Sequence, residues 1–493
     1  MLFNSYTSII MQSIKKIYLL YPPGPIYQRG EDRSQGNVDY STATSMRAPN
    51  DMSYISAQIK KENLEVLFKD YASEKLDLNI MKNDFKNYNP DVVLISTTNS
   101  TVDHDIEILN NFKKINPNII CILKGSIFFK APLDLTKILN LELIDFLIGG
   151  EIEFSFIKII KEINNGSSNF GSINGIYFKK ENIWQSTNFE NWDQEIDELT
   201  FPDRSIIKNS LYVRPDTGEP QATISTSRGC PASCIYCLTP TISGKKVRFR
   251  SSESILKEML DCYNNHEIKN FFFKSDTFTI DKNWVKDLCN KINNSELKDK
   301  IEWVANSRVR PLEYETLQIM RNAGCWLIAF GFESGSSETL KKIKKGATIE
   351  DNLKAAELTR KAGLKLYGFY LVGLPWENKE HLEMTEKHIF NTNPDFLELH
   401  IAVPYYGTEL YDVSKKEGLI KTPIIGQNYF EEASTGTKYL SSQNLINFRR
   451  KVIAKYHLRP KYILSKIKDT KFNYNIIKNY TKYGVRLIHN LLK

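Results

Sequence analysis

The sequence lacks the features that would assign it to a membrane, secreted or disordered protein. No uninterrupted apolar run approaches the roughly 18 residues that a membrane-spanning helix needs. The first residues, MLFNSYTSIIMQS, lack the basic and then apolar layout of a secretory signal. Hydrophobic residues make up 41% and charged residues 25% of the chain, values that exclude a disordered or collagen-like protein. We therefore expect a globular protein of the cytoplasm.

Cysteine is also scarce, with seven residues in a chain of 493. So few cysteines do not form the disulfide framework of a small secreted protein. Three of them, Cys230, Cys234 and Cys237, lie within eight positions, and clustered cysteines in a cytosolic chain indicate metal or redox chemistry. The other four lie in apolar or helical surroundings, where we expect them to be buried and unreactive: Cys121, Cys262, Cys289 and Cys325.

Residues 14–165 alternate strand-like apolar runs with helical patterns. Because these runs are apolar throughout, they are typical of parallel strands that are covered on both faces. We therefore expect an α/β fold, with a doubly wound, flavodoxin-like N-terminal domain whose ligands lie beyond the carboxyl ends of the strands. The runs are KIYLLYP, LEVLFKD, DVVLIST, IICILKG and LIDFLIG.

The pattern changes between residues 166 and 215, which we interpret as a connector and as the place of the domain boundary. The segment INGIYFKKENIWQST indicates a hairpin. The segment ELTFPDRSII contains a proline and indicates an extended stretch.

A second alternating series occupies residues 216–440. Its strand-like runs are ATISTS, NFFFKSD, IEWVANSRV, WLIAFGFES, KLYGFYLVGLP and FLELHIAVPYY. Six β/α units are fewer than the eight of a closed barrel, so we expect a partial (β/α)6 barrel with reactive residues at the carboxyl ends of its strands. After the sixth run, Tyr405 and Tyr406 are expected either to line the substrate pocket or to shape a turn.

The last segment, residues 441–493, is helical in pattern and strongly basic. It has thirteen Lys and Arg against one acidic residue, so it carries a charge of +12, and the rest of the chain carries −4. A local basic segment argues against a general nucleic-acid partner. We expect a helix that docks against the barrel, and the alternative is a peripheral contact with anionic lipid. The residues of its apolar face are Ile477, Tyr480, Gly484, Leu487 and Leu491.

The segment SRGCPASCIYC contains the three clustered cysteines. It spaces three cysteines as C-x-x-x-C-x-x-C directly after the first strand of the second series. Thiolates are soft ligands that suit iron–sulfur clusters, and three ligands leave one iron of a cubane open for a cofactor or substrate. The alternative is a structural zinc site, but such a site needs four protein ligands and no nearby Cys or His supplies the fourth.

This spacing, with the aromatic Tyr236 before the third cysteine, resembles the radical S-adenosylmethionine (SAM) superfamily. Further segments along the chain also resemble that superfamily: VRFRSSESILKEM, FFFKSDTFT, WVANSRVR, GFESGS and YLVGLPWE. The resemblance implies that a 4Fe-4S cluster on the three cysteines binds SAM and cleaves it reductively to methionine and a 5′-deoxyadenosyl radical. It also implies an external electron donor such as flavodoxin or ferredoxin.

Carried over position by position, the resemblance implies residues around SAM at the mouth of the barrel. Tyr236 would contact the adenine through its backbone, and Asp276, Ser307, Arg308 and Glu333 would lie near the cofactor. The alternative is that Arg308 and Glu333 only pair with each other and close the barrel. The residue that acts on the substrate is not identified.

The order of a flavodoxin-like domain, an FPDR connector and the cysteine motif resembles the cobalamin-binding branch of the superfamily. The resemblance implies a corrinoid over the strand ends of the first domain, near Ser96, Thr97, Gly125, Gly149 and Glu151. Small residues there would let the backbone approach a large flat macrocycle. The motif D-x-H-x-x-G, whose histidine ligates cobalt in other cobalamin domains, is absent, and His104 in VDHDIE does not replace it, so the corrinoid would lack a histidine ligand.

Since many members of that branch are methyltransferases, the resemblance implies methyl transfer to an unactivated carbon of a small-molecule substrate. The first alternative is a radical cyclase or rearrangement enzyme without methyl transfer. The methylthiotransferase branch fits less well, because its enzymes carry extra N-terminal cluster cysteines and this chain offers only Cys121. The remaining alternative is a binding or scaffolding protein with a structural or redox-sensing cluster.

Overall fold

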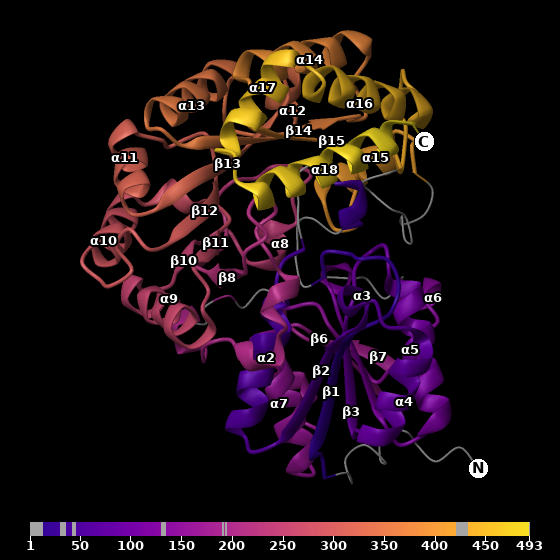
Figure 1. Cartoon of the computed structure of the whole chain (residues 1–493). Coiled ribbons are helices and arrows are strands. Elements are labelled where there is room, and N and C mark those ends of the chain that lie inside the picture. Colours follow the sequence, from indigo (N-terminus) through magenta and orange to yellow (C-terminus); the bar gives the residue numbers. More distant parts are fainter. Residues whose placement is uncertain are drawn as a thin grey trace.

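The computed structural model describes residues 13–29, 36–41, 46–129, 135–189, 192, 195–420 and 432–492. It shows two α/β units that lie against each other, with the C-terminal helices across the larger unit (Figure 1). This arrangement confirms the predicted order of a flavodoxin-like domain, a partial barrel and a helical tail.

The N-terminal unit is built on one sheet with the strand order β2-β1-β3-β4-β5-β6-β7. The first five of these strands are parallel, in the order 2-1-3-4-5 that is typical of a flavodoxin-like fold. They match the five predicted runs: β1 (Lys16–Tyr21), β2 (Glu65–Asp70), β3 (Val92–Ser96), β4 (Ile120–Lys124) and β5 (Phe146–Ile148).

Helices cover both faces of this sheet, as the fully apolar strands require. Figure 1 shows two helices on one face, α2 (Asn50–Lys61) and α7 (Ile152–Asn164). The other face carries α4 (Leu78–Tyr88), α5 (Val102–Ile115) and α6 (Leu135–Ile138). Between β2 and α4 lies the short α3 (Tyr71–Glu74).

The predicted hairpin is present, but it extends the first sheet. Its strands are β6 (Ile176–Lys180) and β7 (Ile183–Ser186), and β6 pairs antiparallel with β5. The turn residues Glu181 and Asn182 have φ of 52° and 63°, the left-handed backbone that a tight two-residue hairpin turn requires. Part of the segment that we assigned to the connector therefore belongs to the first sheet.

The second unit is a six-stranded parallel sheet with the order β15-β14-β13-β12-β11-β8, which confirms the predicted partial barrel. Its outer face packs against helices in one large apolar core. The strands are β8 (Gln221–Ser225), β11 (Asn270–Lys274), β12 (Glu302–Ser307), β13 (Cys325–Glu333), β14 (Lys365–Val372) and β15 (Phe396–Ile401). The outer helices are α9 (Ser252–His266), α10 (Lys282–Asn293), α11 (Tyr314–Asn322), α13 (Ile349–Lys361) and α14 (Lys379–Thr392).

The inner face of this sheet divides into an apolar half and a polar half. Side chains alternate along a strand, so every second residue faces the interior of the barrel. Near the amino ends of the strands the inner residues form an apolar cluster that includes Phe272, Val304, Leu327 and Ala329. Toward the carboxyl ends the same positions carry charges: Lys274, Arg308, Glu333 and Glu398.

The C-terminal segment forms α16 (Ser442–His457), α17 (Pro460–Asp469) and α18 (Tyr474–Leu492). In Figure 1, α18 crosses the open side of the barrel. Four of the five residues predicted on its apolar face line the barrel cavity, which confirms the docking helix; the side chain of the fifth, Leu491, lies outside the described residues. Asn479 and Arg486 tie α18 to both units, through the carbonyls of Asp216 (3.0 Å) and Ser41 (2.9 Å).

Among the described helices, none combines the length and the apolar character that crossing a bilayer requires.

The four scattered cysteines are fully buried, as predicted. Burial raises the pKa of each of these thiols, for Cys262 to about 12, so they remain protonated and unreactive.

The FPDR connector holds the two units together. Arg204, in this connector, lies buried and donates to Glu258 of α9 at 2.7 Å. Arg250 donates to the other oxygen of the same carboxylate. Asp203, the neighbouring connector residue, accepts from Ser56 of α2 at 2.7 Å. The connector thus binds a helix of each unit.

We expect Glu258→Ala to lower the free energy of unfolding by about 3–5 kcal/mol, because it leaves two buried guanidinium groups without their carboxylate. Urea unfolding followed by circular dichroism measures this change. The control Glu253→Gln, on the exposed face of the same helix, should change the free energy by less than about 0.5 kcal/mol. Equal effects of the two substitutions would show that the Glu258 carboxylate does not stabilise the two arginines.

Candidate cluster and cofactor site

The three clustered cysteines lie in one loop at the carboxyl edge of the barrel. This cysteine loop, residues 229–238, runs from β9 (Ser227–Arg228) to α8 (Thr239–Ile242). Cys230 and Cys234 are buried, Cys237 is half-buried, and none of the three forms a disulfide. The loop begins at Gly229, whose φ of 94° and close approach to the carbonyl of Lys246 leave no room for a side chain.

Two hydrogen-bond donors lie near the cysteine sulfurs. The backbone N–H of Thr239 donates to Sγ of Cys237 at 3.4 Å. Nη1 of Arg308, which follows β12, lies 3.6 Å from Sγ of Cys234. Both donors stabilise negative charge on sulfur.

The number of cysteine ligands bears on the choice between a cluster and a single metal ion. No group of three or more His, Cys, Asp or Glu side chains among the described residues is arranged to bind one ion. The ligands of one zinc ion must meet at that ion. A cubane instead binds each cysteine to a different iron, so its ligands lie farther apart. Three cysteines in one loop are one ligand short of a structural zinc site and match a cubane that keeps one iron open.

Asp276 holds the cysteine loop in place. This residue lies just beyond the carboxyl end of β11, where the sequence placed it near a cofactor. Its Oδ2 accepts from the backbone N–H of Gly229 at 2.9 Å, and its Oδ1 accepts from the hydroxyl of Thr239 at 3.3 Å. Because Gly229 and Thr239 flank the three cysteines, the Asp276 carboxylate fixes both ends of the loop.

Beside the loop lies a group of charged residues centred on Lys345, which sequence reasoning missed. Its Nζ pairs with Oε1 of Glu333 at 2.7 Å and lies 3.5 Å from the hydroxyl of Tyr236. Arg308 donates to the backbone carbonyl of Lys345. Arg308 and Glu333 therefore do not pair with each other, as the alternative interpretation required, but both bind Lys345.

The tight packing of this group explains a glycine. A Cβ on Gly331 would lie 2.2 Å from Oε1 of Glu333 and 2.9 Å from Nζ of Lys345. Burial and the nearby Glu333 carboxylate raise the pKa of Tyr236 well above its ordinary value, so the phenol keeps its proton. The group thus presents a carboxylate, an ammonium, a guanidinium and a phenol next to the cysteine loop.

Three other predicted residues are not part of this group. The Ser307 hydroxyl lies 2.7 Å from that of Thr279 and accepts from the Thr279 N–H at 3.2 Å, so Ser307 joins two wall segments of the barrel. Tyr405 packs against the apolar core of the first unit, and the ring of Tyr406 contacts Tyr411 at a centroid distance of 4.8 Å. Neither tyrosine lines the cavity inside the barrel.

At the strand ends of the first unit, the small residues pack against the chain itself. A Cβ on Gly125 would lie 2.8 Å from Cγ2 of Thr97, and one on Gly149 would lie 2.4 Å from the carbonyl oxygen of Phe128. The Ser96 hydroxyl donates to Asp51 at 2.9 Å. These contacts account for the small residues without any ligand.

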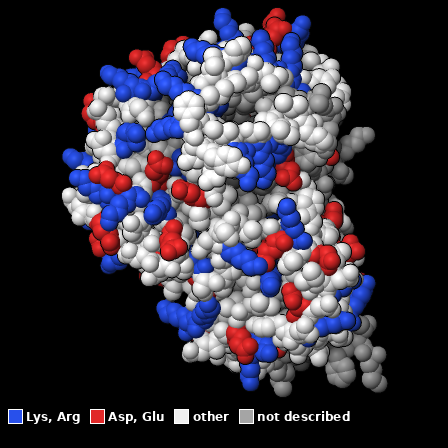
Figure 2. All heavy atoms as spheres, viewed as in Figure 1, with Lys and Arg blue, Asp and Glu red and all other residues white. Residues whose placement is uncertain are grey.

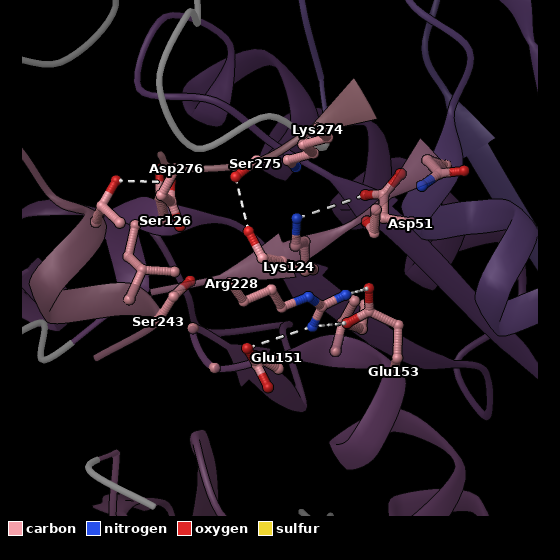
Figure 3. Close-up of a pocket in the computed structure, with 18 of the residues that line it drawn as sticks. Asp51, Lys124, Ser126, Glu151, Glu153, Arg228, Ser243, Lys274, Ser275 and Asp276 are labelled. Atoms are coloured by element: carbon pink, nitrogen blue, oxygen red, sulfur yellow. Dashed lines mark hydrogen bonds and ion pairs between the residues drawn. The ribbon is translucent and has the colours of Figure 1, made fainter. Parts of the chain in front are cut away.

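Glu151 takes part in ion pairs that join the two units. Arg248 pairs with Glu151 at 2.5 Å. Arg228, next to the cysteine loop, pairs with Glu153 at 2.6 Å and with Glu151 at 3.3 Å (Figure 3). Burial alone would raise the pKa of Glu153, but the Arg228 guanidinium lowers it below its ordinary value. These pairs bring the strand ends of the first unit to the cysteine loop.

A cavity of about 70 Å³ lies between the two strand edges (Figure 3). Asp51 and Lys124 enter it from the first unit, and Lys274 and Asp276 enter it from the barrel. Oδ1 of Asn50 also lines it and is buried without a hydrogen-bond partner among the described residues. An unpartnered buried acceptor of this kind indicates a place where a donor group of a ligand can bind.

Comparisons with known proteins agree with this geometry. The sequence profile of the radical SAM superfamily matches residues 224–389. An uncharacterized methyltransferase of Pyrococcus horikoshii is 28% identical over 85% of this chain and 90% of its own. The anaerobic magnesium-protoporphyrin IX monomethyl ester cyclase of Cereibacter sphaeroides is 24% identical over 73% of this chain and 59% of its own.

Two solved structures share the fold over most of the chain. The radical SAM methyltransferase TsrM of Kitasatospora setae, with cobalamin and a [4Fe-4S] cluster bound, has a TM-score of 0.64 at 16% identity and covers 83% of this chain and 76% of its own. The cobalamin-dependent radical enzyme OxsB has a TM-score of 0.69 at 15% identity and covers 98% of this chain and 72% of its own.

We expect Asp276→Ala to loosen the cysteine loop, because the N–H of Gly229 and the hydroxyl of Thr239 lose their acceptor. Alkylation of Cys230 and Cys234 by iodoacetamide in metal-free protein, measured by mass spectrometry, should accelerate about tenfold or more. The control Asp261→Ala, which removes a carboxylate bonded only within α9, should leave the rate unchanged. Equal rates in the two variants would show that Asp276 does not hold the loop.

Proposed function

Because the chain carries a radical SAM domain and so belongs to that superfamily, we propose that it is a cobalamin-dependent methyltransferase acting on an unactivated carbon. The domain implies a 4Fe-4S cluster and SAM. The observation that carries the proposal is the position of the cysteine loop. It lies at the carboxyl edge of the barrel and faces the strand ends of a flavodoxin-like domain.

Cys230, Cys234 and Cys237 are the proposed cluster ligands. Three soft donors in one loop, with a hydrogen bond from Thr239 and the nearby Arg308 guanidinium, suit a cluster that keeps one iron open. When bound, the cluster supplies the electron that cleaves SAM. The protein shields the loop from water, since Cys230 and Cys234 are buried.

The group around Lys345 is the proposed site for the amino-acid end of SAM. A zwitterion offers an ammonium and a carboxylate, and the group offers a carboxylate on Glu333 and cations on Lys345 and Arg308. The ammonium of the cofactor would pair with Glu333 and its carboxylate with the cations, replacing the internal ion pair by two external ones. The Tyr236 hydroxyl, 3.5 Å from Lys345, completes the polar wall.

Cobalamin is proposed to bind between the units. The unpartnered Asn50 oxygen and the polar lining of the cavity suit the amide side chains around a corrinoid. The described cavity of about 70 Å³ is smaller than the macrocycle, so binding requires the strand edges to separate at the Arg228–Glu153 and Arg248–Glu151 pairs. His104 bonds to the carbonyl of Pro23 at 3.1 Å, in keeping with a corrinoid that has no histidine ligand.

The reductive step needs an external electron donor, for which flavodoxin or ferredoxin is the proposed partner. Such a donor would place the enzyme in the cytoplasm. A radical cyclase is the second candidate, because the similarity to the magnesium-protoporphyrin IX monomethyl ester cyclase extends over 73% of this chain. The mass of the product separates the two, since methyl transfer adds one methylene unit and cyclisation removes hydrogen.

We expect the anaerobically reconstituted protein to bind iron, sulfide and cobalamin and to form 5′-deoxyadenosine from SAM. Metal analysis and absorption spectra report the cofactors, and mass spectrometry reports the nucleoside. Cys234→Ala should lose the cluster and all cleavage, whereas Cys262→Ala, which changes a buried cysteine of α9, should keep both. A wild-type protein that binds neither iron nor sulfide would overturn the proposal.

For the SAM site, we expect Glu333→Gln to weaken SAM binding about 10- to 100-fold, because the ammonium of the cofactor loses its charged partner. Equilibrium dialysis measures the dissociation constant, and the iron content should stay unchanged. Glu338→Gln, on the exposed helix α12 (Ser337–Lys342), is the matched control. Equal binding by the wild type and both variants would remove Glu333 from the SAM site.

A further inference from the structure

A second and larger cavity lies inside the amino-terminal half of the barrel. Its volume is about 640 Å³, within the roughly 300–1,000 Å³ typical of ligand pockets. The inner faces of the strands form one wall, and α17 and α18 form the other. Its lining is mainly aromatic and aliphatic: Phe272, Val304, Trp326, Leu327, Tyr367, Phe369, Phe396, Tyr462, Ile463, Ile467, Ile477, Tyr480, Leu487 and Ile488.

The charged residues of this cavity are largely neutralised by their neighbours. Arg214 stacks on Trp326 at 4.0 Å and pairs with Asp216 at 2.7 Å. Lys466 lies 3.9 Å from the ring centre of Phe396 and pairs with Asp469 at 3.5 Å. The cavity therefore offers a ligand ring faces and hydrocarbon, with little free charge.

One polar side chain connects this cavity with the site above it. Asn306 of β12 lines the cavity and makes no side-chain hydrogen bond to any described residue. Arg308, two residues further along the chain, lies 3.6 Å from Sγ of Cys234. Two residues of a strand span about 7 Å, so one strand repeat and the length of the Arg308 side chain separate the upper end of the cavity from the cysteine loop. A ligand that fills the cavity thus has its upper end directed toward that loop.

The wall made by α17 and α18 carries exposed apolar side chains. Phe472, at the turn between the two helices, is 89% exposed, and Leu464, Tyr474 and Val485 outside the cavity are 62–76% exposed. In Figure 2 the surface over these helices is largely uncharged and hollowed, with basic groups beside it. The basic residues of this part of the chain include Lys461, Lys468, Lys471, Lys478 and Lys482.

We propose that the cavity binds a large, mainly hydrocarbon substrate, and that the substrate enters from an anionic bilayer on which α17 and α18 lie. The apolar lining is continuous with the exposed apolar rim, because Phe472, Ile467 and Ile488 belong to both. The reaction of this substrate rests on the proposed function. Its binding in the cavity can be tested without that function.

The charge of the C-terminal segment supports an anionic bilayer as the source of the substrate. Residues 441–493 carry +12, and a basic residue near an anionic surface contributes about 1 kcal/mol to binding. An apolar face bordered by lysines is what an interfacial helix requires. Exposed aromatic residues such as Phe472 and Tyr474 are suited to the level of the headgroups.

The first experiment tests the cavity with cis-parinaric acid, a fluorescent polyene fatty acid, on the full chain. Energy transfer from the tryptophans of the barrel should report its binding, and Trp326→Phe should reduce that signal more than Trp184→Phe does. Gly484 of α18 lines the cavity, and a Cβ there meets no atom within 4 Å. Gly484→Phe should therefore fill the cavity without strain and weaken binding about tenfold or more.

Two controls make the cavity assay decisive. Gly484→Ala adds a single methyl group and should retain binding, and Gly171→Phe, at another unobstructed glycine in the first unit, should leave it unchanged. The melting temperature of Gly484→Phe should not fall, since replacing a helical glycine favours the helix. Equal binding by the wild type and Gly484→Phe would overturn the cavity as the site.

The second experiment measures co-sedimentation with vesicles of phosphatidylcholine alone or mixed with phosphatidylglycerol. The wild type should pellet with the mixed vesicles only. The double substitution Leu464→Glu and Val485→Glu, outside the cavity, should abolish pelleting and retain binding of the probe. Equal pelleting of wild type and variant, or none with mixed vesicles, would overturn the bilayer as the source. Neither assay involves SAM cleavage, so failure of the proposed function would leave both readouts intact.

Discussion

Ion pairs at the carboxyl edges of the two sheets hold the two units of this structure together. Arg228 and Arg248 of the barrel reach Glu153 and Glu151, which lie just beyond the carboxyl edge of the first sheet. Removing one partner of such a largely buried pair costs several kcal/mol, because the other charge stays out of water. The cysteine loop starts directly after Arg228, so its position relative to the first unit depends on these contacts. A separation of the two units at these pairs therefore shifts the loop relative to the first sheet.

Features that depend on neighbouring residues could be predicted from the sequence. The apolar runs identify the parallel strands, and the cysteine spacing identifies a loop of soft ligands, because each pattern is complete within about ten residues. The edge position of the hairpin is not encoded so locally. Nothing in the segment 173–187 distinguishes pairing with β5 from an independent ribbon, since that choice depends on which sheet edge is open.

Contacts between site residues also depend on parts of the chain that are distant in sequence, so they could not be predicted from local patterns. Lys345 lies twelve residues beyond Glu333, and α12 must turn back between them before the two charges can meet. Ser307 ends a strand as predicted, yet it bonds to Thr279 in the barrel wall while Asn306 faces the interior. A register of one residue decides which of the two faces a ligand, and a sequence pattern does not fix register that closely. Gly125 and Gly149 were predicted to let the backbone approach a macrocycle, and in the structure a Cβ at either position would meet the chain itself, at Thr97 and Phe128.

The alternation of side chains along the barrel strands links binding with chemistry. On one inner face, apolar residues near the amino ends give way to charged residues near the carboxyl ends, as Phe272 does to Lys274 and Ala329 to Glu333. The apolar part of a ligand is therefore favoured in the lower, amino-terminal half of the barrel, and a zwitterion is favoured in the upper, carboxyl-terminal half. The two halves meet between Asn306, which lines the apolar cavity, and Arg308, whose guanidinium lies next to the cysteine loop. By forming one wall of the lower half, α18 shields part of its apolar lining from water, and exclusion of water is what limits side reactions of a radical.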